Sequence, residues 1–263
     1  MLAKYRVFLK AGWASMLEYR VSVLVGMAFS WLPLLPLAVW LSIMDGSGPI
    51  NGYSRDELVS YFLAAVAMRQ IIVVWIGWTL PAQINQGELS PKLLRPIHPI
   101  HQEIAGHLAQ KLVTIPVLLV FIVPVALLFG GVSYAGGVAS IPALIASVAG
   151  AWGITFFANY SLALLAFWMT KVNALIDMWY ATGMLLSGVL VPIAFLPKGL
   201  ATVITYSPFP SMIAFPIDIL MGRVHGAGLA QGFAIMALWL AFFIALSNLL
   251  WQHGLRRYSA VGA

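Results

Sequence analysis

Residues 112–170 read LVTIPVLLVFIVPVALLFGGVSYAGGVASIPALIASVAGAWGITFFANYSLALLAFWMT, and this stretch decides the fold. Its 59 residues include no Asp, Glu, Lys or Arg. A helix needs about 20 apolar residues to cross the hydrocarbon core of a bilayer, so the stretch is long enough to cross it twice. The glycine-rich segment 130–137 supplies a turn between the two crossings. The sequence therefore predicts two membrane-spanning helices here, over 112–129 and 141–170.

The composition of the whole chain agrees with a membrane protein. Of its 263 residues, 62% are hydrophobic and 8% are charged, and the mean hydropathy is +0.94. About a quarter of the residues of an ordinary soluble domain are charged, so a water-soluble globule is excluded. The net charge of +6 comes from basic residues at the ends of apolar stretches, which indicates contact with lipid headgroups and no nucleic-acid partner. The absence of cysteine excludes disulfides and thiolate chemistry.

Four further stretches are long and apolar enough to cross a membrane. They cover residues 21–44, 58–80, 175–195 and 229–251. The sequence thus predicts an all-α, polytopic membrane protein with six transmembrane helices. Residues 1–263 are expected to form a single transmembrane domain. Residues 1–20 repeat apolar side chains at steps of three and four, which predicts a helix lying along the membrane interface.

A seventh uncharged stretch, 199–217, is interrupted by Pro208, Pro210 and Pro216. Each proline leaves a helix carbonyl without its usual donor, and lipid cannot replace that donor. We therefore expect re-entrant or outer helices over 199–222, before the last span.

The distribution of basic residues predicts the orientation of the six spans. Ten of them fall on the side that holds both termini: Lys4, Arg6, Lys10, Arg20, Lys92, Arg95, Lys111, Lys171, Arg256 and Arg257. The opposite side holds Arg55, Lys198 and Arg223. Because cytoplasmic segments are enriched in Lys and Arg, both termini are expected in the cytoplasm.

Motifs of nucleotide and ester hydrolysis are missing. A P-loop needs Gly-Lys followed by Ser or Thr, and the six lysines are followed by Tyr, Ala, Leu, Leu, Val and Gly. The segment around Ser133 reads Gly-Val-Ser-Tyr-Ala and lacks the final glycine of a nucleophile elbow, so Ser133 is interpreted as a turn residue. We expect no catalytic residue in this chain.

One cluster of histidines could bind a metal. It comprises His98, His101 and His107 with Glu103, and Glu103 and His107 share a helix face. The position next to the membrane surface favours hydrated or headgroup-facing side chains instead. We therefore expect no metal or cofactor in this chain, and a metal at the cluster stays the alternative.

Four polar side chains fall within predicted spans: Arg69, Asp177, Asn159 and Asn248. An arginine at mid-span costs at least about 2.5 kcal/mol on insertion, so Arg69 must face the protein interior, a water-filled cavity or a partner subunit. Asp177 is close enough to a helix end to reach water. The two asparagines are interpreted as donors of hydrogen bonds between helices.

The connection between the second and third spans holds a short predicted helix. Ser90-Pro91-Lys92-Leu93-Leu94-Arg95-Pro96 begins with an N-cap residue, has proline at the first helical position and ends at a proline. With the preceding Gln86-Gly87-Glu88-Leu89, it resembles a signature of the six-span permease subunits of ABC-2 class ATP-binding-cassette exporters. Leu58–Phe62 and the proline pattern over 188–216 support this resemblance, which covers nearly the whole chain.

The resemblance implies an N-terminal elbow helix over 1–20, a cytoplasmic coupling helix over 90–95 and re-entrant helices before the last span. It implies a partner pair of ATPase chains that bind ATP and Mg²⁺, and a second permease chain, either a different paralogue or a copy of this one. The implied coupling residues are Glu88, Leu89, Pro91, Lys92, Leu93, Leu94, Arg95 and Pro96. The implied location is the plasma (inner) membrane of a prokaryote.

The function expected from these observations is export of a hydrophobic or amphipathic molecule, driven by ATP hydrolysis in partner chains. Trp75, Trp78, Phe156 and Trp179 suit apolar cargo, although they could equally face lipid. Two alternatives stay open at this point. One is a stand-alone channel or secondary transporter, and the other is a membrane-embedded metalloenzyme that uses the histidine cluster.

Overall fold

The computed structural model describes residues 29–258, apart from the side chains of Phe29 and Ser47. The expected elbow helix at 1–20 and the first part of the span expected at 21–44 lie outside the described residues. The regular structure within 29–258 is helical, with one isolated bridge between Ile50 and Tyr53. The all-α prediction is confirmed for this part of the chain.

The α-helices are α3 (Leu34–Ser47), α4 (Arg55–Ile72), α5 (Ile76–Asn85), α6 (Ser90–Leu93), α7 (Pro99–Phe129), α8 (Ile141–Leu164), α9 (Asn173–Leu186), α10 (Lys198–Thr205), α11 (Pro208–Met212), α12 (Ala214–Leu220) and α13 (Gly226–Leu255). Four short 3₁₀ turns accompany them, at Phe29–Trp31, Val138–Ser140, Leu165–Phe167 and Ile193–Phe195.

Four helical segments of the described residues are long and apolar enough to cross a membrane. They are Arg55–Asn85, Pro99–Phe129, Val138–Phe167 and Gly226–Leu255. The chain is therefore a multi-pass membrane protein. Helices α3 and α9 have 14 residues each, and at about 1.5 Å per residue they are shorter than the hydrocarbon core.

Helix α9 ends earlier than the span expected over 175–195. It stops at Leu186, and Gly188 follows with φ of 92°. A Cβ at position 188 would lie 2.6 Å from the Tyr61 hydroxyl, so only glycine fits there. The chain turns at this close approach, and Pro192 follows it.

The span expected over 58–80 is broken in the middle. Helix α4 ends at Ile72, Val73–Trp75 are not helical, and α5 begins at Ile76. The expected span ends at residue 80, but α5 includes Pro81 and continues to Asn85. The carbonyls freed by the break accept hydrogen bonds from side chains of other helices.

The span expected over 112–129 belongs to a longer helix, because α7 begins at Pro99. Lys111 was placed in a cytoplasmic connection, but it lies within α7 and is 7% exposed. Residues 198–220 form three short helices in place of one crossing, which agrees with the effect expected of their prolines.

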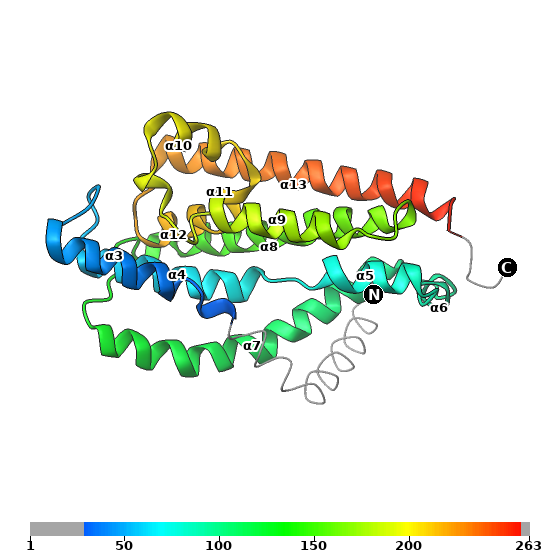
Figure 1. Ribbon diagram of the computed structural model, residues 1–263, viewed down its shortest axis with the longest axis horizontal. Helices are drawn as coiled ribbons and strands as arrows, with labels where there is room; N and C mark the ends of the chain where they lie inside the picture. The colour runs from blue at the N-terminus through cyan, green and yellow to red at the C-terminus, as the bar shows by residue number, and fades with distance from the viewer. Residues whose placement is uncertain (1–28, 259–263) are drawn as a thin grey trace.

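The connections between long helices gather at two opposite ends of the molecule (Figure 1). At one end, the hydroxyls of Ser90 and Tyr258 lie 2.9 Å apart, which joins the 86–98 connection to the end of α13. At the other end, the Ser133 amide donates to Ser60 Oγ over 3.0 Å. The helices therefore run back and forth between these ends.

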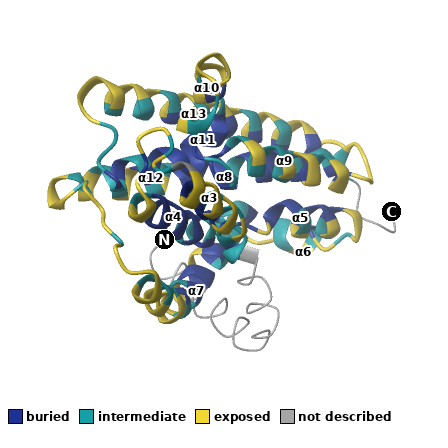
Figure 2. Cartoon of the chain, turned by 60° about the vertical axis from the view of Figure 1, so that its left-hand side comes forward, coloured by how far each residue is buried: buried dark blue, intermediate teal, exposed yellow. Residues whose placement is uncertain are grey.

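Helix α8 lies at the centre, and buried residues concentrate on it and on α4, α11 and α12 (Figure 2). Helices α7 and α13 bury few residues of their most apolar 18-residue windows, 11% and 17%. This distribution is expected where lipid covers the outer helices, because an apolar side chain loses little by facing lipid.

Candidate functional site

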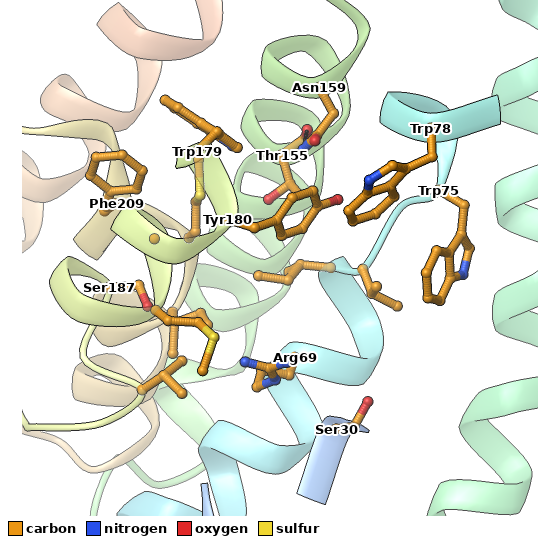
Figure 3. A pocket seen from close by; sticks show the side chains of 17 residues that line it. Ser30, Arg69, Trp75, Trp78, Thr155, Asn159, Trp179, Tyr180, Ser187 and Phe209 are labelled. Atoms are coloured by element: carbon orange, nitrogen blue, oxygen red, sulfur yellow. Dashed lines mark hydrogen bonds between the residues drawn. The ribbon is translucent and has the colours of Figure 1, made fainter. Parts of the chain in front are cut away.

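A cavity of about 400 Å³ opens beside the break between α4 and α5 (Figure 3). Helices α4, α5, α8, α9 and α11 contribute to its wall. Its aromatic lining residues are Trp75, Trp78, Trp179, Tyr180 and Phe209. Its polar lining residues are Ser30, Arg69, Thr155, Asn159 and Ser187. This is an apolar, ligand-sized space with a few polar groups, as small-molecule sites are.

The break itself is held open by two side chains from other helices. Lys111 Nζ donates to Gln70 O over 3.0 Å and to Val73 O over 2.6 Å. The Tyr180 hydroxyl donates to Val74 O over 2.8 Å. A broken helix leaves carbonyls without intrahelical donors, and within a membrane the protein must supply replacements. Lys111 and Tyr180 are those replacements.

Arg69, in the last turn of α4, lies among the lining side chains of the cavity. Within residues 29–258 it forms no ion pair, since the three ion pairs there join other residues. The expectation that Arg69 faces the interior or a cavity therefore agrees with its position. Arg69 is the cation of the cavity wall, whereas the Lys111 ammonium donates to backbone carbonyls.

Asp177 supports the aromatic wall from outside. Its Oδ1 accepts from Trp78 Nε1 over 3.3 Å, and Asp177 itself is exposed on α9. The Trp78 ring stacks on Tyr180 with centroids 4.5 Å apart. Asp177 thus orients Trp78 and is absent from the lining.

Of the two asparagines, Asn159 lines the cavity and Asn248 does not. Asn159 is fully buried, and its Nδ2 donates within α8 to Thr155 O over 2.8 Å. Its Oδ1 and the Ser187 hydroxyl are buried without hydrogen-bond partners in the described part of the chain. Asn248 is exposed on α13. Asn159 therefore bonds its own helix, where a bond between helices was expected.

The predicted coupling segment lies at the end of the molecule where α5, α7 and α13 meet. Its helix, α6, is four residues long, so it is shorter than the expected 90–95. Lys92 Nζ donates to Gln83 Oε1 over 2.8 Å and to Glu103 Oε1 over 2.7 Å. Ser90 contacts Tyr258, as described above. The segment is thus bonded to α5, to α7 and to Tyr258, which follows α13.

The residues of this segment divide into an inner and an outer group. Leu89 is fully buried, and Lys92 and Leu93 are partly buried. The exposed residues are Glu88, Pro91, Leu94, Arg95 and Pro96. Leu94 is 88% exposed, the highest value among the large hydrophobic side chains of the described residues. Arg95 Nη1 donates to Gln102 Oε1 over 3.2 Å.

The histidines of the possible metal cluster have separate surroundings. His98 Nδ1 accepts from the Ile100 amide over 3.2 Å, and its ring lies 4.6 Å from Trp251. Burial, followed by the charge of His101, lowers the pKa of His98, so its ring is neutral at neutral pH. His107 packs against Phe156. Within 29–258, no three His, Asp or Glu side chains gather as metal ligands.

Sequence reasoning missed Lys111 and Tyr180 as partners of the helix break. One available signal was the run of β-branched residues Ile71–Val74, since such residues are weak helix formers. No pattern in the sequence indicated which donors would reach the freed carbonyls.

The fold and the cavity define a polytopic membrane protein with a ligand-sized space among its helices. A family model described as ABC-2 family transporter protein matches residues 31–262. The chain belongs to this family, which confirms the resemblance carried by residues 86–96. It is therefore a membrane permease component of the ATP-binding-cassette transporter type. No curated protein and no solved structure gave a match.

Proposed function

We propose that this chain is the transmembrane subunit of an ATP-binding-cassette exporter. Separate ATPase chains hydrolyse ATP, and the permease moves a hydrophobic or amphipathic molecule out of the cytoplasm. Family membership is the observation that carries this proposal. The lack of a Gly-Lys-Ser/Thr motif in the sequence supports a partner that binds ATP and Mg²⁺.

Six spans complete the proposed topology. Four are the long helices given above, α3 is the end of the first span, and α9 with the segment that follows it is the fifth. The contact between Ser90 and Tyr258 supports a C-terminus on the same side as the coupling segment. With the positive-inside count, this favours cytoplasmic termini in the plasma membrane of a prokaryote.

The proposed ATPase-docking face consists of Leu94, Arg95 and Glu88. Leu94 presents an apolar side chain to the surroundings, with a cation and an anion nearby in the chain. Lys92, in the same segment, donates hydrogen bonds to Gln83 of α5 and to Glu103 of α7. A movement of a docked ATPase would therefore pass to α5, and from α5 to the break beside the cavity.

A second permease chain, either a paralogue or a copy of this one, completes the proposed assembly, with lipid around it. The two alternatives predict different results. A channel or secondary transporter would work without an ATPase. A metalloenzyme would lose activity on His107→Ala and would purify with metal.

Co-purification from the native membrane in mild detergent tests the proposal. We expect an ATPase chain to be recovered with the wild type. Leu94→Glu and Arg95→Glu should each lower its recovery about tenfold or more, because both alter the centre of the docking face. Leu200→Glu is the matched control, since Leu200 is exposed on α10, away from α6.

Recovery of an ATPase that is insensitive to both coupling variants would refute the docking face. Recovery of this chain alone, with chemical crosslinking also negative, would refute the exporter assignment.

A further inference from the structure

We propose that the cavity beside the α4–α5 break binds an amphipathic anion: a molecule with one acidic group and an aromatic or other apolar body. This inference rests on the proposed function for the role of the ligand as cargo. The binding site itself rests on the side chains that line the cavity.

The charge of the cavity favours an anion. Arg69 is the charged residue among the lining side chains, and none of them is a carboxylate. The nearby carboxylate Asp177 is exposed, accepts from Trp78 Nε1 and is absent from the lining. An organic cation would meet a guanidinium with no acid to offset it, whereas an acidic group would gain a charge-assisted hydrogen bond.

A comparison with Lys111 shows that the fold can provide hydrogen-bond acceptors for a buried cation. Both basic groups lie in membrane-spanning helices, where an unpaired charge is costly. The ammonium of Lys111 is bound by two carbonyls. No corresponding acceptor for Arg69 lies in the described part of the chain, and its guanidinium faces the cavity, where an acidic group of a bound molecule can reach it.

The apolar lining defines the rest of the ligand. Trp75, Trp78 and Tyr180 form a group of neighbouring rings, with Trp75 and Trp78 centroids 5.6 Å apart. Trp179 and Phe209 form a second group, with centroids 4.7 Å apart. A volume of about 400 Å³ holds a body of two or three fused or linked rings, and aromatic walls favour flat apolar bodies.

Two residues of the lining also have buried polar atoms without partners within residues 29–258. Ser187 Oγ and Asn159 Oδ1 belong to lining residues that are 3% and 0% exposed, and neither atom has a hydrogen-bond partner in the described residues. An unpaired buried polar group costs about 1–3 kcal/mol. Both atoms are closed off from the cavity in this conformation, so a ligand reaches the Ser187 hydroxyl or Asn159 Oδ1 only after the side chain rotates.

The test compares two fluorescent probes that differ in the acidic group. Anilinonaphthalene sulfonate is an amphipathic anion, and N-phenylnaphthylamine has the same aromatic body without the sulfonate. Each is titrated against the purified full chain in discs of phosphatidylcholine, with energy transfer from tryptophan as the readout and empty discs as the blank. We expect the sulfonate probe to bind about tenfold more tightly or better, as a charged hydrogen bond would provide.

Three variants locate the effect. Arg69→Gln should remove the preference for the sulfonate probe and leave the affinity for the neutral probe unchanged. Arg69→Lys keeps the charge and should retain most of the preference. Arg55→Gln is the control, because Arg55 pairs with Asp45 at the surface.

Equal affinity of the wild type for both probes would overturn the proposal without any variant. A preference that survives Arg69→Gln would overturn the assignment to this cavity. Discs that also contain phosphatidylglycerol distinguish the source of the ligand: displacement of the probe indicates a lipid headgroup, and no displacement indicates a free molecule. The probe titration contains no ATPase, so its result does not depend on the exporter assignment. Likewise, recovery of an ATPase in the co-purification does not depend on the probe titration.

Discussion

Two segments of this protein have the same length and opposite surroundings. Helices α4 and α5 together cover Arg55–Asn85, and α7 covers Pro99–Phe129, 31 residues each. In the most apolar 18 residues of each, 72% are buried in α4–α5 and 11% in α7. The buried segment is broken at Val73–Trp75, whereas α7 is continuous despite Pro116 and Pro124.

The difference follows from the supply of hydrogen-bond donors. Lipid offers none, so a helix that faces lipid must satisfy its own carbonyls. A helix surrounded by protein can be interrupted where side chains take over, and here Lys111 and Tyr180 do so. The break lies at the start of α5, which runs from the cavity to the coupling segment.

The largest expected effect is that of Lys111→Met. This change leaves Gln70 O and Val73 O without their donor, at about 1–3 kcal/mol each, partly offset because an ammonium is no longer buried. We expect a net loss of about 2–4 kcal/mol in unfolding free energy, measured by thermal or denaturant unfolding in detergent. Lys171→Met is the control, since Lys171 is exposed; equal stability of both variants would contradict the role of Lys111.

A pair of glycines gives a direct comparison of the two segments. A Cβ at Gly77, in α5, would lie 3.1 Å from Asn159 Oδ1 and 3.2 Å from Ile176 Cγ2, whereas a Cβ at Gly106, in α7, would meet nothing within 4 Å. Gly77→Ala should therefore cost about 1–3 kcal/mol through overpacking. Gly106→Ala should stabilise by about 0.5–1 kcal/mol, because alanine is the better helix former.

Unfolding midpoints of the two alanine variants, measured side by side, check this difference. A gain in stability for Gly77→Ala would show that α5 is not packed as closely as the structure indicates, and a loss for Gly106→Ala would contradict the open space beside α7.

The smallest expected loss of stability is that of Tyr180→Phe. It removes the hydroxyl that donates to Val74 O and keeps the ring that stacks on Trp78. We expect a loss of about 0.5–1.5 kcal/mol in unfolding free energy. Tyr206→Phe is the control, because the Tyr206 hydroxyl binds Gln231 at an exposed position. A loss no greater than that of the control would mean that water or another donor replaces Tyr180 at the break.

Several elements could be predicted from the sequence because they depend on local composition. The long uncharged run over 112–170 contains the apolar parts of α7 and α8, and three prolines between 208 and 216 accompany short helices. The segment at 86–96 identified the family, and the family model over 31–262 confirms it. Arg69 was singled out by its cost in a span, and it lies at the cavity.

Other features depend on neighbours that are far away in the chain. Lys111 was placed outside a span because a lysine usually marks a helix end, yet it lies 38 and 41 residues from the carbonyls that it binds. Asn159 was expected to bond another helix, but its Nδ2 donates to Thr155 O in its own helix, and its Oδ1 lies beside Gly77 of α5. Nothing in the local pattern encodes these distances.

The sequence by itself determined that the chain enters a membrane, that it is helical, and to which family it belongs, because hydropathy, proline positions and a short motif are local properties. Only the tertiary structure decided where a spanning helix breaks, which cation donates to backbone carbonyls and which faces a cavity. The physical reason is that a carbonyl or a charge within a membrane must find its partner in the protein, and packing determines which residue comes within reach.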